Sequence, residues 1–157
     1  MQVQYRWTDG NDVDFRRFYS KTEEYYSSLV GGVQNRQAFV PYNLSQAITD
    51  VIIAEAEGRA AGCAGLKEYS AEDVEIKRVW VEPEFRGRHI AEEMINRLEE
   101  KAKEQGFRRL ILQTRPAMKG AVGLYEKLGY RKIENYPPYD RLDGAVCYGK
   151  EIVSPVE

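Results

Sequence analysis

The chain has 157 residues, 43% hydrophobic and 31% charged, which is ordinary for one soluble globular domain with a real core. A formal charge of −2 argues against general nucleic-acid binding, which needs a basic stripe. No apolar run is long enough to cross a membrane, and the two cysteines and single histidine have no metal-ligand spacing. We therefore expect a single cytoplasmic domain over residues 1–157, with no metal, nucleic acid or membrane partner.

The first 69 residues predict three strands, one long helix and one short helix. Val3, Tyr5 and Trp7 alternate as in a strand, and the aromatic residues that follow recur near helical spacing. The turn at 57–59 is short enough to join two antiparallel strands, in which Gly62 and Gly65 permit close backbone approach. In order, we predict a strand at 3–7, a helix at 12–30, a loop at 33–45, a short helix at 45–49, and strands at 50–57 and 60–69.

The central segment, residues 74–106, carries the clearest pattern in the chain. Residues 74–81 read as a strand whose alternation breaks near Arg78, which predicts a β-bulge, and Pro83 ends the strand. Apolar residues then recur every three or four positions from Ile90, which predicts a long amphipathic helix. Gly106 suits the left-handed conformation that ends such a helix.

The turn Arg86-Gly87-Arg88-His89 lies directly before this helix. A helix start presents backbone N–H groups and the positive end of the helix dipole, and two guanidinium groups add charge at the same place. This combination favours phosphates. The sequence therefore predicts a site for a pyrophosphate group at residues 86–91.

The remaining elements predict parallel pairing beside the antiparallel hairpin. We expect a buried strand at 109–114, a helix at 117–128, and strands at 130–134 and 145–152. Strands that alternate with helices pair in parallel, so the predicted fold is an α/β fold with a mixed sheet and helices on both faces.

The central segment resembles motif A of the GCN5-related N-acetyltransferases, the GNAT superfamily, whose signature Q/R-x-x-G-x-G/A follows a bulged strand. Arg86 matches the first position and Ala91 the sixth, while His89 stands where the signature has glycine. The run AVGLYEKLGY at 121–130 is similar to a second family block, A-x-x-L-Y-E-K-x-G-F. The resemblance covers roughly residues 50–152.

The resemblance implies a central sheet that splays at the bulged strand, and direct transfer of acetyl from acetyl-CoA to a primary amine of a small molecule or peptide. The alternative is a catalytically silent acyl-CoA-binding or protein-interaction module on the same fold. Two departures from the family pattern, His89 and Met118, give that alternative some weight. The expected cofactor-binding residues are Val79, Trp80, Val81, Arg86, Gly87, Arg88, His89, Ile90 and Ala91.

His89 leaves three options open at the glycine position. Its amide can still face a phosphate if the side chain turns outward and φ stays helical, its imidazole can bind phosphate directly, or cofactor binding is lost.

The resemblance also implies catalytic residues. Tyr125 matches the tyrosine that reprotonates the coenzyme A thiolate, with a core tyrosine as the alternative. Glu75 has the offset from Arg86 of the family's general base, with an exposed strand carboxylate as the alternative. For the acceptor, Arg115, Arg36 and Tyr139 are weaker candidates. The sequence leaves the acceptor and the oligomeric state open, with a homodimer as one option.

Overall fold

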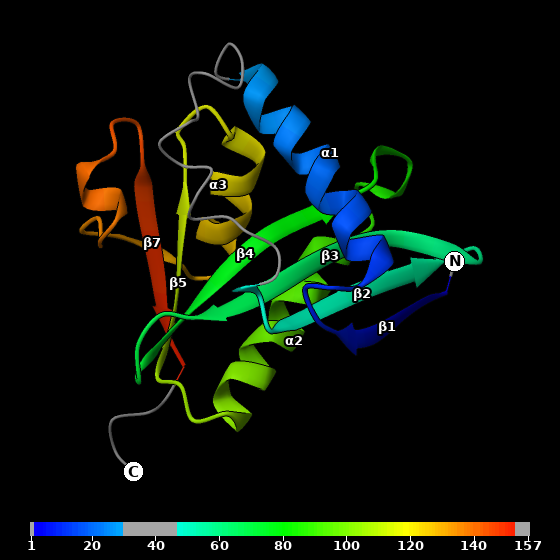
Figure 1. The fold of residues 1–157 in the computed structure, drawn as a ribbon, viewed down its shortest axis with the longest axis horizontal. Coiled ribbons are helices and arrows are strands. Elements are labelled where there is room, and N and C mark those ends of the chain that lie inside the picture. The colour runs from blue at the N-terminus through cyan, green and yellow to red at the C-terminus, as the bar shows by residue number, and fades with distance from the viewer. Residues whose placement is uncertain (1, 30–46, 153–157) are drawn as a thin grey trace. The chain divides into compact units, whose positions relative to one another are not determined.

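A computed structural model of the chain describes residues 2–29 and 47–152. Its seven strands follow the order β1-β2-β3-β4-β5-β7-β6 in a mixed sheet, which confirms the predicted fold class (Figure 1). The strands are β1 Val3–Thr8, β2 Asp50–Ala56, β3 Arg59–Glu68, β4 Asp73–Val81, β5 Arg109–Thr114, β6 Arg131–Ile133 and β7 Val146–Glu151. The helices are α1 Val13–Leu29, α2 Ile90–Glu104 and α3 Lys119–Lys127, with short 3₁₀ turns at Pro83–Phe85 and Tyr139–Arg141.

The chain divides into two compact units, each with its own contacts. The first unit comprises Met1–Lys67 and Ile76–Leu98, and the second comprises Glu68–Glu75 and Glu99–Glu157. The prediction of one domain over residues 1–157 stays a prediction. None of the helices in the described part of the chain is long and apolar enough to cross a bilayer.

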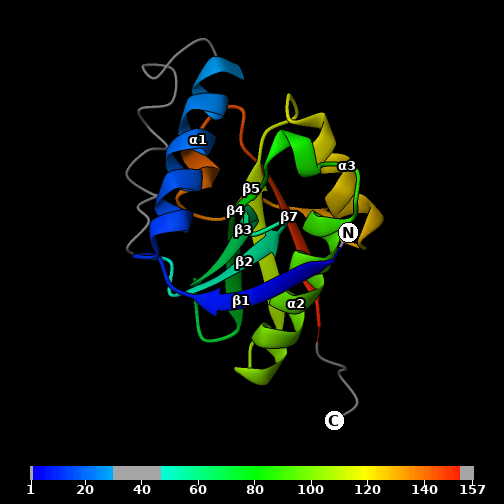
Figure 2. The ribbon, with the colours of Figure 1, turned by 90° about the vertical axis from the view of Figure 1, so that its right-hand side faces the viewer.

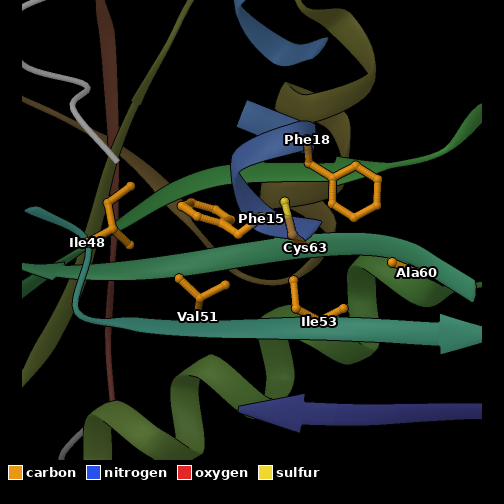
Figure 3. Packing of buried hydrophobic residues seen from close by; sticks show 7 residues of the cluster. All are labelled: Phe15, Phe18, Ile48, Val51, Ile53, Ala60 and Cys63. Atoms are coloured by element: carbon orange, nitrogen blue, oxygen red, sulfur yellow. The ribbon is translucent and has the colours of Figure 1, made fainter. Parts of the chain in front are cut away.

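The first unit is an antiparallel sheet covered on both faces. β2 and β3 pair antiparallel, as the hairpin pattern predicts, and β1 pairs antiparallel with β2. The helices α1 and α2 lie on opposite faces of these strands (Figure 2). On the α1 face a buried cluster forms, since helical spacing turns Phe15 and Phe18 toward alternating strand residues (Figure 3). The cluster consists of Phe15, Phe18, Ile48, Val51, Ile53, Ala60 and Cys63.

The glycines of β3 permit close approach, as predicted. A Cβ at Gly62 would lie 2.6 Å from the Trp80 carbonyl oxygen, and one at Gly65 would lie 2.5 Å from Ile48 Cγ2. Both distances are shorter than any real Cβ contact, so a larger residue would force the backbone of β4 or the Ile48 side chain away.

The predicted irregularity in β4 lies at Arg78. This residue adopts φ +56, a left-handed conformation inside a strand, at the position where the alternation breaks. Its guanidinium is buried, donates to Thr22 Oγ1 at 3.0 Å and to Glu23, and stacks 4.2 Å from the centroid of the Tyr19 ring. Its carbonyl oxygen accepts from the Cys63 thiol at 3.3 Å. The irregular residue of β4 therefore fastens α1 to the sheet.

The second unit contains the predicted parallel pairing. β4 pairs in parallel with β5 over residues 73–75 and 109–111, and the Arg109 guanidinium donates to the Asp73 carboxylate at 2.8 Å beside this pairing. β7 pairs antiparallel with both β5 and β6. The splaying of the sheet that the resemblance implies stays a prediction.

Helix ends follow local chemistry. Gly106 adopts φ +88 just after α2, and the Phe107 N–H donates to the Ala102 carbonyl at 3.0 Å, which closes the helix in the way predicted for this glycine. The helix α3 begins at Lys119 and not at residue 117 as predicted, because Arg115 and Met118 first close a turn through a 2.9 Å backbone hydrogen bond.

Candidate functional site

The turn before α2 combines two left-handed residues. Gly87 has φ +80 and His89 has φ +62, and α2 begins at Ile90. The His89 carbonyl accepts from the Glu93 N–H at 3.0 Å, so His89 is the N-cap residue. Within the described residues, the N–H groups of Gly87, His89, Ile90 and Ala91 have no hydrogen-bond acceptor in the protein. They are the donors that an anion needs at a helix start.

His89 departs from one part of the expectation. Its side chain turns outward as predicted and is 77% exposed, with Nδ1 2.9 Å from Glu92 Oε2. The prediction that φ stays helical is wrong, because the backbone takes the left-handed conformation that glycine adopts readily. Histidine is among the residues that visit this region more often than most, so the turn keeps its path with a side chain present.

The two arginines of the turn pack on aromatic residues. The Arg86 guanidinium carbon lies 4.8 Å from the centroid of the Trp80 ring, and its Nε donates to the Val81 carbonyl at 2.8 Å. The Arg88 guanidinium carbon lies 5.9 Å from the centroid of the Phe85 ring. The side chain of Arg86 therefore ties the turn to the end of β4, where the resemblance places the pantetheine arm.

Trp80 has an unusual environment at the end of β4. Its indole N–H is buried and has no hydrogen-bond acceptor among the described residues. The Tyr25 ring meets the indole edge to face at 5.8 Å. Aromatic stacking and the Arg86 cation thus hold the indole in place, which fixes the strand residues on either side of it.

In the second unit, Glu75 is 4% exposed, so the alternative of an exposed strand carboxylate is wrong. Its Oε2 accepts from the Tyr136 hydroxyl at 2.8 Å. Burial, together with the charge and hydrogen bond of Glu75, raises the pKa of Tyr136 well above its ordinary value. Tyr136 therefore stays protonated at neutral pH, and its hydroxyl remains a hydrogen-bond donor.

The Tyr136 ring belongs to a cluster of tyrosines. Tyr69 lies 4.9 Å and Tyr139 lies 5.4 Å from it between ring centroids, both edge to face. Tyr139 is only 2% exposed, and its predicted contact with the acceptor stays a prediction. Tyr136 is not among the site residues predicted from the sequence. The feature that could have pointed to it is the density of tyrosines in the loop at 136–141.

Tyr125 is 6% exposed and lies on α3 against Tyr130, with 5.6 Å between ring centroids. The Tyr130 hydroxyl donates to Glu99 Oε2 at 2.8 Å, and Lys150 Nζ donates to Glu99 Oε1 at 3.0 Å and to the Leu128 carbonyl at 2.9 Å. Burial, followed by the charge and hydrogen bond of Glu99, raises the pKa of Tyr130. A hydrogen-bonded network thus fixes the neighbour of Tyr125.

Two arginines, Arg36 and Arg115, are predicted to contact the acceptor. Arg36 lies outside the described residues. Arg115 follows β5, and its Nη1 lies 3.2 Å from the position that a Cβ at Gly144 would take, so its guanidinium packs on the backbone of the loop before β7. In residues 2–29 and 47–152, no group of three or more metal-ligating side chains is found.

Comparison with known proteins identifies the family of this chain. The sequence profile described as the acetyltransferase (GNAT) family matches residues 13–130. The chain belongs to this family. Among curated GNAT relatives, the uncharacterised N-acetyltransferase YjgM of Escherichia coli K12 is 31% identical over 85 residues, which cover 52% of this chain and 51% of YjgM. The chain thus spans about half the length of the curated relatives it matches.

Solved GNAT structures share the fold along nearly the whole chain. A Klebsiella pneumoniae protein assigned to the acyl-CoA N-acyltransferases superposes with a TM-score of 0.80 at 21% identity, covering 97% of this chain and 99% of that one. The PaiA N-acetyltransferase of Thermoplasma acidophilum, solved in complex with coenzyme A, has a TM-score of 0.74 at 14% identity, with coverages of 96% and 99%.

Proposed function

We propose that the protein is an acetyl-CoA-dependent N-acetyltransferase that transfers acetyl directly to a primary amine of a small molecule or peptide. The observation that carries this proposal is the turn Gly87–Ala91, where two left-handed residues and a helix start leave backbone N–H groups without an acceptor among the described residues. Family membership supports it, and so does PaiA, a structural neighbour solved with coenzyme A.

The residues at the end of β4 and in the turn before α2 then have binding roles. The N–H groups of Gly87 to Ala91 bind the pyrophosphate, and Arg88 adds positive charge near it. Arg86 holds the turn to β4 through the Val81 carbonyl. The backbone of Val79 to Val81 pairs with the pantetheine arm as an added strand would.

Glu75 and Tyr125 have the roles of base and acid. Acetyl-CoA provides the acetyl group as a thioester. Glu75 accepts the proton of the incoming ammonium, so that the amine nitrogen can form the new C–N bond as the C–S bond breaks. Tyr125 gives its phenolic proton to the departing thiolate. Protein side chains form no covalent bond with the acetyl group, and alignment of the two substrates supplies much of the rate.

The alternative is a silent acyl-CoA-binding or interaction module. Its support came from His89 at a glycine position and Met118 in place of the usual asparagine. The left-handed φ of His89 weakens that support, since the backbone runs as glycine would let it run. Met118 Sδ accepts from Thr114 Oγ1 at 3.6 Å, so the sulfur takes part in a polar contact at the start of α3.

Titration calorimetry with acetyl-CoA and thiol release upon amine addition test the proposal. We expect binding in the wild-type protein and coenzyme A release with at least one class among amino acids, polyamines, aminoglycosides and peptides. Tyr125→Phe is expected to lower kcat by about 10²-fold or more with little change in affinity, since general acid catalysis contributes 10² to 10⁴.

Tyr148→Phe is the matched control. Its phenol also donates to a glutamate, Glu126, at 3.3 Å, and its loss should leave kcat nearly unchanged. Absence of acetyl-CoA binding at millimolar concentration would reject the enzyme. Binding without release for any amine would favour the silent module, and an unchanged rate in Tyr125→Phe would remove Tyr125 from the mechanism.

A further inference from the structure

The Glu75 carboxylate is held by a residue far away in the sequence. Tyr136 lies 61 positions later, in the loop between β6 and β7, and its hydroxyl donates to Glu75 Oε2 at 2.8 Å. The carboxylate is almost fully buried, at 4% exposure. A buried carboxylate without such a donor would favour its neutral form, because burial disfavours charge.

The loop that carries Tyr136 is itself fixed from several sides. The Tyr69 hydroxyl donates to the Pro137 carbonyl at 2.8 Å, and Asn135 Nδ2 donates to the Ala145 carbonyl at 2.9 Å. Tyr69 and Tyr139 flank the Tyr136 ring edge to face. The ring therefore has little freedom to turn, and its hydroxyl stays directed at Glu75.

We propose that Tyr136 is a positioning residue for the general base: its phenol fixes the orientation of the Glu75 carboxylate and donates a hydrogen bond to its charged form. This inference rests on the proposed function, in which Glu75 takes a proton from the acceptor ammonium. A phenol is suited to this task because it donates a strong hydrogen bond to an anion while remaining neutral itself.

The titratable and charged groups near this pair come from β4, β5, β7 and the two flanking loops. Burial raises the pKa of Tyr69 and of Cys147 on β7, so both stay neutral at neutral pH. Asp73, on the same strand, is paired with Arg109 of β5 at 2.8 Å. The negative charge of Asp140, in the turn after Tyr136, also raises the pKa of Tyr69.

The decisive experiment compares wild type with Tyr136→Phe over pH 4.5 to 9. Loss of a hydrogen bond to the charged form raises the pKa of a carboxyl group. We expect the acidic limb of kcat/KM to move up by about one pH unit and kcat at pH 7 to fall by about tenfold, with the affinity for acetyl-CoA unchanged. The Glu75 side chain, labelled with ¹³C and followed by NMR, should titrate with the same upward shift.

Two further variants separate positioning from folding. Tyr148→Phe removes a phenol that donates to another glutamate and should shift neither the limb nor the Glu75 signal. Glu75→Gln should flatten the acidic limb, and adding Tyr136→Phe to it should cost nothing more in kcat, since both changes act on one group. Additive losses would show that Tyr136 acts only through the fold and would overturn the inference.

The outcomes also keep the inference apart from the function on which it rests. An unshifted Glu75 signal in Tyr136→Phe overturns the inference, whatever the activity. A shifted signal with an unmoved kinetic limb overturns it as well, because Glu75 would then not be the base. A wild type that binds no acetyl-CoA and turns over no amine rejects the proposed function, while the NMR titration still reports on the bond between Tyr136 and Glu75.

Discussion

The helices α1 and α2 begin in opposite ways. At α1 the N-cap residue is Asp12, whose Oδ1 accepts from the Asp14 N–H at 2.9 Å and from the Phe15 N–H at 3.1 Å. At α2 the N-cap residue is His89, whose imidazole turns away to Glu92. The first helix satisfies its amides with its own carboxylate, so it offers nothing to an anion. The second leaves amides of its first turn without an acceptor among the described residues, as the proposed pyrophosphate site requires.

The largest expected effect comes from giving α2 the kind of cap that α1 has. His89→Asp places a carboxylate beside the first-turn amides, where it competes with and repels a pyrophosphate. Calorimetry should show a loss of acetyl-CoA affinity on the order of 100-fold, since like charges a few ångströms apart repel by several kcal/mol even when partly screened. His89→Asn caps the same amides without the charge, and we expect it to lose about tenfold or less. Equal losses in the two variants would contradict the electrostatic explanation.

The converse change removes the cap from α1. Asp12→Ala should lower the free energy of unfolding by about 1 to 2 kcal/mol, the usual cost of a lost N-cap. Urea unfolding followed by circular dichroism measures this value at pH 7. Acetyl-CoA affinity should be unchanged, since α1 takes no part in the anion site.

The difference in free energy of unfolding between wild type and Asp12→Ala depends on pH through the pKa of Asp12. Burial alone would raise this pKa, but hydrogen bonds from Arg6, the Phe15 N–H and Thr8 bring it below its ordinary value. A lowered pKa means that the carboxylate stabilises the fold above about pH 4 and that this contribution is lost as the pH falls further. The difference in free energy of unfolding between wild type and Asp12→Ala should therefore be smaller at pH 3 than at pH 7. An equal difference at both pH values would rule out the ionised carboxylate of Asp12 as its source.

Some features of the fold and of the candidate site can be predicted from the sequence, and others cannot. The turn before α2, the strand break at Arg78 and the end of α2 at Gly106 depend on neighbours a few residues apart, so local pattern predicts them. The bond between Tyr136 and Glu75 joins residues 61 positions apart, and no local pattern contains it. The left-handed φ of His89 also escaped prediction, because residue type alone favoured a helical backbone there.

The smallest expected effect concerns His89 itself. His89→Gly removes the side chain and keeps a backbone that glycine adopts without strain. Relief of that strain and the greater freedom of the unfolded chain oppose each other, so stability should change by less than about 1 kcal/mol. Acetyl-CoA affinity should stay within about twofold of wild type by calorimetry. A tenfold loss would instead mean that the imidazole binds phosphate directly.

The left-handed residue of β4 has a consequence for how this strand can change during evolution. Side chains of a strand alternate between faces, and Arg78 resets that alternation once. Deleting a single residue here would exchange the faces of everything that follows in the strand, moving Trp80 out of its place under α1. Insertions and deletions between Glu75 and Val81 should therefore survive only in compensated pairs, while the loops on either side of the strand remain free to vary in length.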